Sequence, residues 1–316
     1  MDPLSHLLAG PRARGAFALK VLMAPGWSIL VQDRAPLTLM VALGPRAWVA
    51  AGGERHELRA GDVVLVRGPA PYTVADSADL APDVVIHPDQ ECSTPSGMKI
   101  GLTLHHGVRT WGTGRPDQAA LLIGTYLTDA ELTTAVTGPL PDVAVLPAGT
   151  IDAGLLALLE REITGGAPGQ GSVVDRLLDV VLVHAVRAWS ELNAHRLGGW
   201  LAGAADPLVA GALELFHTHP AAPWTIQSAA TRLNVSRATL ANRFRAQVGE
   251  PPMTYLSNWR LLLASELLSD PGLTTAAIAT RVGYGSPFAF STAFKRRFGV
   301  SPTAFRTRNR APTATA

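Results

Sequence analysis

The only thiol of the chain stands close to a histidine, and this pair could carry redox or metal chemistry. Cys92 follows His87 by five residues, after the apolar run Val84–Ile86. A thiol beside an imidazole can be deprotonated at neutral pH, and the thiolate reacts with oxidants and binds soft metals. A closed zinc site would need further donors, for which His105 and His106 stand nearest. The alternative is a small buried apolar residue whose pKa is raised by the acidic residues around it.

A second histidine pair has the spacing of metal ligands. His217 and His219 are separated by one residue and are followed by Pro220. Histidines at such a position more commonly face the last carbonyls of a helix, so we expect a structural role and no metal. The sequence contains no GxxxxGK[ST], GxSxG or HExxH pattern, which removes the usual signatures of nucleotide-binding, hydrolase and zinc-peptidase sites. We therefore predict no catalytic residues and no cofactor.

Aromatic residues of the first half are candidates for a small-molecule pocket. Tryptophans 27, 48 and 111 fall among short apolar runs, although β-rich domains bury such side chains routinely. The residues that we expect to line an effector pocket are Trp48, Tyr72, His87, Cys92 and Trp111.

The charges divide unequally along the chain. Residues 1–205 carry 15 Lys and Arg against 20 Asp and Glu, a net charge of −5, whereas residues 206–316 carry 12 against 5, a net charge of +7. A basic segment joined to an acidic one suggests that only the basic part meets a polyanion.

The basic segment contains an internal repeat. Ala230-Thr231-Arg232-Leu233 returns 49 positions later as Ala279-Thr280-Arg281-Val282. Fifty positions separate a further set of matches, which pairs Phe244 with Phe294, Gly249 with Gly299, Pro252 with Pro302 and Tyr255 with Phe305. One residue inserted in a turn accounts for the change of spacing.

Each copy of the repeat predicts a short helix, a tight turn and a second helix. Thr225 and Ser236 have the residue types and positions of helix N-caps in the first copy, as Thr274 and Ser286 have in the second. Glycines end both second helices, and Pro252–Ser269 predicts one long helix between the copies. This is the helix-turn-helix pattern, whose second helix enters the DNA major groove by its N-terminal part, and one rigid spacer suits two grooves about 34 Å apart.

The candidate DNA contacts follow from this pattern. Outward positions of the second helices and the basic residues beside them are Ser236, Arg237, Ala238, Thr239, Ala241, Asn242, Arg243, Arg245, Ser286, Pro287, Phe288, Ala289, Ser291, Thr292, Lys295, Arg296 and Arg297. In the second copy the outward positions offer apolar contact to thymine methyl groups and hydroxyl hydrogen bonds instead of arginine forks to guanine.

These residues resemble a known family. Residues 207–308 are similar to the double helix-turn-helix domain of the AraC/XylS transcription regulators. The similarity rests on Ala-Ala-x-x-Leu-x-Val-Ser at 229–236, Leu-x3-Phe-Arg-x3-Gly at 240–249, Arg260-x3-Ala264, Ile-Ala-x2-Val-Gly-Tyr at 278–284, and Phe-Lys-Arg-Arg-Phe-Gly-Val-Ser-Pro-x3-Phe-Arg at 294–306. The sequence departs from the family at Asn242, where an arginine is common.

The first half resembles the cupin-type regulatory domain that often precedes this DNA-binding domain. The resemblance rests on Leu58-Arg-Ala-Gly-Asp62, on the opening Asp2-Pro-Leu-Ser-His-Leu-Leu, and on His87-Pro and Val108-Arg-Thr-Trp-Gly112. Apolar runs at intervals of roughly ten residues agree with an all-β domain. Where a catalytic cupin would have a His-x-His pair, the chain has Trp48-Val49-Ala50, which counts against the alternative of a metal-dependent cupin enzyme fused to a DNA-binding domain.

The expected organisation is an α+β chain of two domains. A cupin-like β-barrel sensor spans residues 1–147, a helical connector and dimerisation segment 148–197, a linker 198–205, the double helix-turn-helix domain 206–309 and a disordered tail 310–316. In the connector, helices are expected over Asp152–Ile163 and from an N-cap at Ser172. The apolar stripe of the second of these comprises Val173, Leu177, Val180, Val181, His184 and Val186.

The resemblance implies a regulator that binds double-stranded DNA, senses a small-molecule effector, forms a homodimer and contacts RNA polymerase where it activates. Apolar residues make up 47% of the chain, and no run approaches the ~18 consecutive apolar residues of a membrane span. With one cysteine and no signal-peptide pattern, we expect a cytoplasmic protein.

Overall fold

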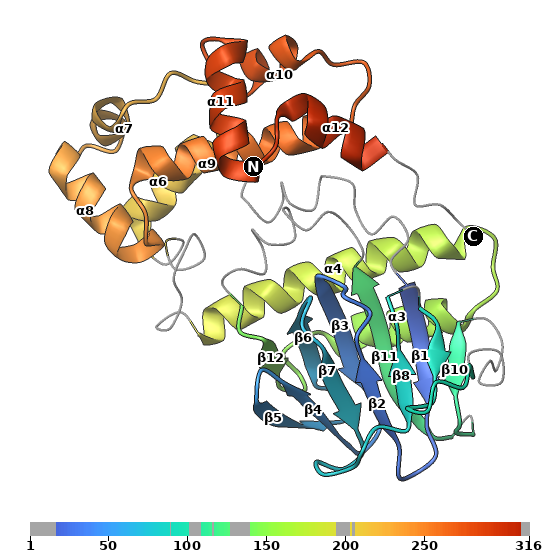
Figure 1. Cartoon of the computed structure of the whole chain (residues 1–316). Helices are drawn as coiled ribbons and strands as arrows, with labels where there is room; N and C mark the ends of the chain where they lie inside the picture. Colours follow the sequence, from blue (N-terminus) through green and yellow to red (C-terminus); the bar gives the residue numbers. More distant parts are fainter. Residues whose placement is uncertain are drawn as a thin grey trace. The chain divides into compact units, whose positions relative to one another are not determined.

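The chain folds into two compact units (Figure 1). A computed structural model describes residues 17–88, 90–100, 109–115, 117–126, 140–193, 203 and 206–310. One unit covers Pro11–Leu192 and the other contains Asn193–Ala316. In the residues that the structure describes, the first is built from strands with two helices and the second from helices, so the predicted β-rich half and helical half are confirmed.

The β-unit contains two six-stranded sheets. Their orders are β10-β1-β11-β3-β6-β12 and β5-β4-β7-β2-β8-β9, and neighbours are antiparallel except for β1/β10 and β2/β8. The strands of the first sheet are β1 Phe17–Leu22, β3 Leu37–Ala42, β6 Val63–Arg67, β10 Thr110–Gly112, β11 Ala119–Tyr126 and β12 Val143–Leu146. Those of the second are β2 Ser28–Val31, β4 Arg46–Ala51, β5 Glu54–Arg59, β7 Tyr72–Ala75, β8 Val84–Ile86 and β9 Cys92–Ser93.

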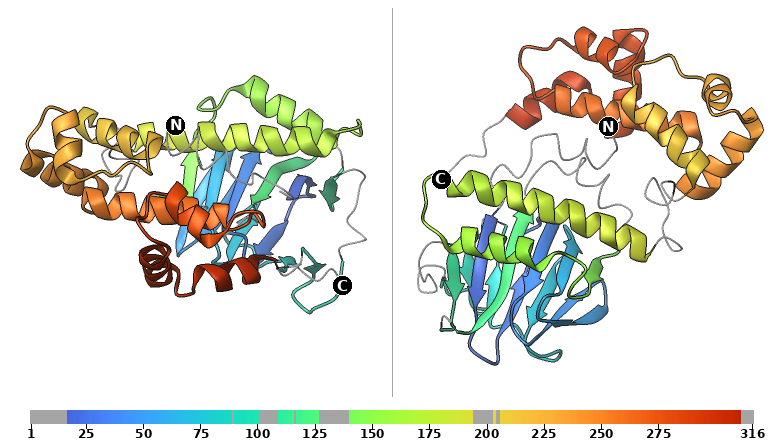
Figure 2. Two further views of the ribbon diagram at one scale, coloured as in Figure 1. Left: turned by 90° about the horizontal axis from the view of Figure 1, so that it is seen from above. Right: turned by 180° about the vertical axis from the view of Figure 1, so that it is seen from behind.

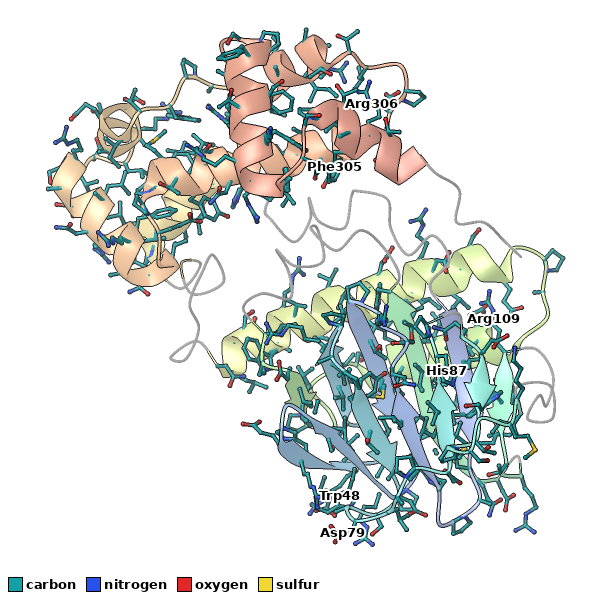
Figure 3. The ribbon with its side chains drawn as sticks, viewed as in Figure 1. Trp48, Asp79, His87, Arg109, Phe305 and Arg306 are labelled. Atoms are coloured by element: carbon teal, nitrogen blue, oxygen red, sulfur yellow. The ribbon has the colours of Figure 1, made fainter. Side chains whose placement is uncertain are left out.

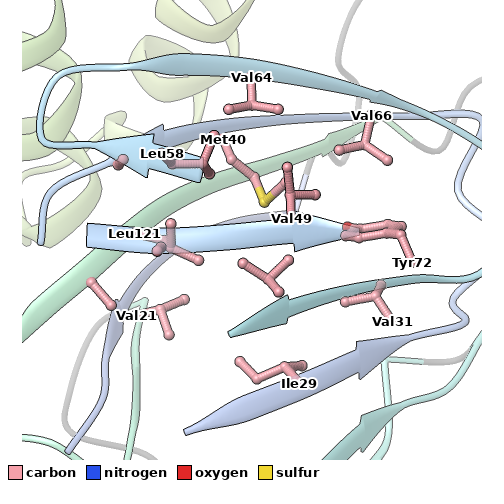
Figure 4. Close-up of a cluster of buried hydrophobic side chains, with 14 of the residues drawn as sticks. Val21, Ile29, Val31, Met40, Val49, Leu58, Val64, Val66, Tyr72 and Leu121 are labelled. Atoms are coloured by element: carbon pink, nitrogen blue, oxygen red, sulfur yellow. The ribbon is translucent and has the colours of Figure 1, made fainter. Parts of the chain in front are cut away.

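The strands that the structure describes form two sheets and show no closed barrel of the kind that the sequence suggested. Among the described strands, every backbone pairing lies within one sheet or the other. At two edges of these sheets lie the short strands β9 and β10, with two and three residues. Apolar side chains from both sheets form a core between them, including Ile29, Val49, Met40 and Leu121 (Figure 4).

Two helices pack on the first sheet, where α3 contacts β1 and α4 contacts β12 (Figure 2). Helix α3 spans Ala153–Thr164 and begins, as expected, with Asp152 accepting a hydrogen bond from the Leu155 N–H at 2.9 Å. Helix α4 spans Gln170–Leu192, so it begins before the N-cap predicted at Ser172. Gln170 donates to the carbonyl oxygens of Glu162 and Ile163 at the end of α3, and this contact fixes the start of α4.

Only some residues of the stripe predicted along α4 are buried, among them Val181 and Val186. The buried residues are Val174, Leu178, Asp179, Val181, Leu182, Ala185, Val186 and Trp189. Leu178 packs so closely that a Cβ on Gly124 of β11 would lie 2.5 Å from its Cδ2 atom. Val173 and Val180 are 43% and 41% exposed, and His184 is exposed as well. The helix therefore carries a second apolar stripe that no described residue covers.

The helical unit follows the repeat. Its helices are α6 Pro207–Thr218, α7 Ile226–Arg232, α8 Arg237–Val248, α9 Pro252–Leu267, α10 Thr275–Arg281, α11 Pro287–Phe298 and α12 Pro302–Arg310. The predicted caps Thr225, Ser236, Thr274 and Ser286 each accept a hydrogen bond from a backbone N–H of the first turn. Gly249 and Gly299 end α8 and α11 in the left-handed conformation.

Aromatic residues at matching positions hold each half of this unit together. Phe244 of α8 contacts Tyr255 of α9 edge-on, with ring centroids 5.6 Å apart. Phe294 of α11 contacts Phe305 of α12 in the same edge-on manner at 5.4 Å. Both Phe244 and Phe294 are fully buried, so equivalent residues of the repeat form equivalent cores.

Candidate nucleic-acid interface and ligand cavity

The first helix-turn-helix consists of α7 and α8. Ala229 and Ala230 are completely buried, which lets the two helices approach closely. Asn234 turns the chain in the left-handed region at φ 56°. Ser236 then caps α8, because its side chain accepts from the Thr239 N–H at 3.0 Å. The first turn of α8 is solvent-exposed.

The second helix-turn-helix, α10 and α11, repeats this geometry. Gly283, 49 positions after Asn234, has a φ of 83°. A Cβ at Gly283 would lie 2.7 Å from the Cα of Ala221, so the turn needs glycine for space as well as for its conformation. The sequence alone did not show that these two turn residues share the left-handed conformation.

Most of the expected DNA contacts are exposed. Ala241 and Ser291 are half-buried, and the other fifteen residues predicted from the sequence are exposed, including Asn242 of α8 and Phe288 of α11. Exposure gives these side chains access to a partner, and the residue types decide which of them suits DNA.

Arg243 is already engaged within the unit. Its Nε and Nη2 donate to the same oxygen of Asp206 at 3.0 and 2.6 Å. Burial acts to raise the pKa of Asp206, but hydrogen bonds from Arg243 and from the N–H groups of Val209 and Leu208 more than offset this, and that pKa lies below its usual value. The expected role of Arg243 as a free DNA contact therefore competes with an existing ion pair.

The other predicted cations of the recognition helices differ in their surroundings. Within the part of the chain that the structure describes, Arg237, Arg245, Lys295 and Arg296 make no salt bridge. The guanidinium of Arg297 lies 5.5 Å from the ring centroid of Phe298. Lys295 comes seven residues after Phe288, so both lie on one face of α11.

Two half-buried arginines hold the loops that precede the helix-turn-helix units. Arg260 of α9 donates to the carbonyls of Pro220 and Ala222, both at 2.7 Å. Arg306 of α12 donates to those of Leu268 and Leu273 at 3.1 and 2.7 Å (Figure 3). These arginines position the loops ahead of α7 and α10 and are not free to contact DNA.

The histidine pair of the helical unit does not form a metal site. Nε2 of His217 lies 2.8 Å from the hydroxyl oxygen of buried Tyr255, whereas His219 is exposed at the end of α6. His217 thus bonds the side chain of Tyr255 within the helical unit. Among all described residues, no group of three His, Cys, Asp or Glu side chains is arranged to hold a metal ion. His105 and His106 lie outside the described residues.

A cavity of about 450 Å³ opens between the two sheets of the β-unit. Its apolar walls come from Leu19, Val21, Ile29, Val31, Met40, Val74, Ile86, Leu121 and Ile123, and its remaining lining residues are Asp33, Tyr72, Gln90, Glu91, Cys92, Lys99, Trp111 and Thr125. Figure 4 shows Val31, Tyr72, Ile29 and Met40 among the side chains between the sheets. Burial raises the pKa of the Tyr72 hydroxyl well above its usual value, so that hydroxyl stays protonated.

Three of the five predicted pocket residues line this cavity, namely Tyr72, Cys92 and Trp111. Trp48 does not, because strand alternation buries Ala47 and Val49 and places Trp48 on the other face of β4. Figure 3 shows it well away from His87. Trp27 belongs to the core without lining the cavity. Sequence reasoning missed the aliphatic walls, whose residues read as ordinary strand core, and the polar residues Asp33 and Lys99.

His87 lies beside a neighbouring hollow that Cys92 also borders. Its Nε2 is 2.9 Å from Oγ of Ser93 and its Nδ1 is 3.4 Å from Nε2 of Gln32. The Cys92 thiol donates to the Gln90 carbonyl at 3.8 Å, and burial raises its pKa. The imidazole therefore bonds groups other than the thiol, which disfavours a reactive thiolate.

Comparison with known proteins agrees with both halves of this description. A family model described as a cupin matches residues 2–191, and one described as a helix-turn-helix domain matches residues 229–308. AraC-like transcription regulators from Streptomyces antibioticus and Streptomyces lividans are 31% and 30% identical over 97% of this chain and 98% of their own length.

Among solved structures, the C-terminal domain of AraT, a response regulator from Geobacillus stearothermophilus, is 34% identical. The match covers 35% of this chain and 93% of that domain, with a TM-score of 0.33. None of the described helices is long and apolar enough to cross a membrane. From its relatives over nearly the full length, the chain belongs to the AraC-like transcription regulators, DNA-binding proteins that here carry an N-terminal cupin domain.

Proposed function

We propose that this regulator contacts two successive major grooves with the first turns of α8 and α11, and that its β-unit controls the contact in response to a small molecule. The main support is the pair of helix-turn-helix units, whose recognition helices are both exposed at their N-terminal turns. Both helices also bear cations that form no salt bridge with described residues. In this role the protein catalyses no reaction. It acts in the cytoplasm, and RNA polymerase is a further partner if the DNA-bound protein activates transcription.

The test of DNA binding is a salt series with the full-length chain. A duplex selected from a random library by the protein serves as the probe, with affinity followed by fluorescence anisotropy between 50 and 200 mM salt. With about six to eight phosphate contacts, affinity should fall roughly a thousandfold or more. Lys295→Ala should weaken all sequences alike and reduce the salt slope by about one, whereas Asn242→Ala should cost about 1–3 kcal/mol only on the selected duplex.

Arg46→Ala provides the control for these variants, because Arg46 is an exposed cation of the β-unit. Its affinity and its salt slope should match those of the wild-type chain. Tight duplex binding that does not respond to salt would contradict the proposal.

For the effector, the lining of the cavity favours a largely apolar molecule that is neutral or positively charged. The walls are aliphatic and aromatic, and the charged lining residues are Asp33, Glu91 and Lys99, which sum to one negative charge. Lys99 is already paired with Glu91 at 2.7 Å. The carboxylate of Asp33, 8% exposed, accepts from the Ala35 N–H and from Gln90. An anionic ligand would meet this buried negative charge without a free cation among the described lining residues.

Two naphthalene probes of similar size test this charge preference. We expect 2-naphthylmethylammonium to bind the full chain more tightly than 2-naphthylacetate in titration calorimetry. Asp33→Asn should narrow the difference, whereas Asp79→Asn should not, because the Asp79 side chain is 86% exposed and pairs with Arg55. Equal binding of both probes, or no change in Asp33→Asn, would contradict the ligand class and leave the DNA-binding proposal standing.

A further inference from the structure

Phe288 is the most exposed large apolar side chain among the described residues that carry one, at 82%. It is the second residue of α11, in the turn that Ser286 caps through the Ala289 N–H. The ring contributes nothing to the core, because Phe290 and Phe294 fill the inward positions and are completely buried. Exposed apolar surface is unfavourable in water, so covering this ring with a partner lowers the free energy of the complex.

The repeat shows that this phenyl ring is not needed for folding. Phe288 lies fifty positions after Ala238, the equivalent residue of α8. Both positions are exposed in the first turn of their recognition helices. Since alanine suffices at this position in one unit, the larger side chain in the other calls for a role in recognition.

The side chains around Phe288 exclude the most common hydrogen-bonded readout. Pro287, Ala289 and Thr292 are exposed beside it, and the first cation of α11 is Lys295, two turns later. No arginine fork can therefore reach guanine from the first two turns of α11. Helix α8 differs, because it offers Arg237 and Asn242 in the corresponding region.

We infer that Phe288 contacts the 5-methyl group of a thymine in the major groove, and thereby selects thymine in the half-site under α11. Thymine is the base that presents a methyl group there, and aromatic and other apolar side chains contact it. The operator is then asymmetric: α8 reads its half-site through hydrogen bonds, and α11 reads the other through apolar contact. This inference rests on the proposed DNA binding.

Uracil substitution tests it directly. The probe is a duplex selected from a random library by the wild-type full chain, in which each thymine is replaced in turn by uracil. This change removes one methyl group and leaves base pairing and phosphate charge intact. At one or two positions we expect the wild-type chain to bind about fourfold more weakly, the ratio that corresponds to ~0.8 kcal/mol per buried methyl group.

The variants locate the effect. In Phe288→Ala the uracil penalty at those positions should fall below about twofold, while the thermal midpoint stays unchanged. In the control Asn242→Ala, affinity should drop but the same uracil penalty should remain. A chain for which no uracil position matters, or in which Phe288→Ala keeps the penalty, overturns the inference while salt-dependent binding still supports the proposed function. Loss of all salt-dependent duplex binding by the wild-type chain overturns both.

Discussion

At the scale of single residues, the ion pair between Arg243 and Asp206 sets the charge that the first recognition helix presents. The carboxylate lies 2.6 Å from Nη2 of Arg243 and also caps α6 through the N–H groups of Leu208 and Val209. The pKa of Asp206 is lowered in the folded protein, so its contribution to stability is present above the ordinary aspartate value near 4. That contribution is lost as the pH falls through the lower, folded-state pKa.

Asp206→Asn should release Arg243 while asparagine still caps α6. We expect binding to random-sequence duplex to strengthen about two- to tenfold and the salt slope to steepen by about one phosphate contact. Anisotropy over a salt series measures both quantities. Asp270→Asn serves as the control, because Asp270 is exposed and accepts from the Gly272 N–H without pairing to an arginine. An unchanged slope in Asp206→Asn would show that Arg243 does not reach phosphate.

At the scale of secondary structure elements, Gly283 and Gly299 of the second helix-turn-helix both have a positive φ but differ in the space around them. The Gly283 turn lies against the Ala221 backbone of the loop before α7, so the second helix-turn-helix packs on the loop that precedes the first. Gly299 also has a positive φ of 73°, but a Cβ there would meet nothing within 4 Å.

We therefore expect Gly283→Ala to lower the free energy of unfolding of the helical unit by about 2–4 kcal/mol, through both strain and overlap. Gly299→Ala should cost only about 1 kcal/mol, because it adds strain alone. Urea unfolding followed by far-ultraviolet circular dichroism compares the two. Equal losses would mean that the Ala221 loop moves aside at little cost.

The same scale shows which elements could be predicted from the sequence. The caps and stripes of α7, α8, α10 and α11 are local signals, and the structure has these helices where the sequence placed them. Strand β5 has no apolar run to predict it, because it lies at the edge of its sheet, only Leu58 is buried, and the other residues of Glu54–Arg59 are polar. In α4, two apolar stripes overlap, and contacts with the sheet such as the packing of Leu178 on Gly124 select the stripe that is buried.

For the candidate sites, residue types predicted the exposed recognition helices, but they did not predict the contacts within the protein that compete with DNA for the same side chains. The pairing of Arg243 with Asp206 spans 37 positions, which no local pattern reveals. Tyr72, Cys92 and Trp111 line the cavity. Trp48 was proposed from its residue type alone, and it does not line the cavity because Ala47 and Val49 are the buried residues on either side of it along β4. Closure of the barrel depended on pairing between distant strands, and periodicity carries no information about that.

At the scale of the whole molecule, we propose that the exposed stripe of α4 joins two chains in a homodimer. Val173, Leu177, Val180 and His184 are spaced at four, three and four residues, so they share one face of the helix. Covering this stripe with a second copy would remove apolar surface from water. It would also double the number of recognition helices held by one assembly.

Val180→Glu should raise the dimer dissociation constant at least tenfold, because it places a charge in the apolar contact. Light scattering of the full chain across micromolar concentrations reports the association. Ala157→Glu introduces the same side chain at an exposed position of α3 and should leave the dimer intact. A wild-type chain that is monomeric throughout this range would rule out the proposed contact.

The arginine clamps of the helical unit have a consequence for the order in which the protein matures on the ribosome. Arg260, which holds the loop before α7, follows α8 directly in the next helix, whereas Arg306 holds the loop before α10 from α12. During synthesis the first DNA-reading half is therefore clamped once α9 has emerged, while α10 and α11 wait for α12. We therefore expect a stage of synthesis at which the loop before α7 is already held by Arg260, while the loop before α10 is not yet held by Arg306.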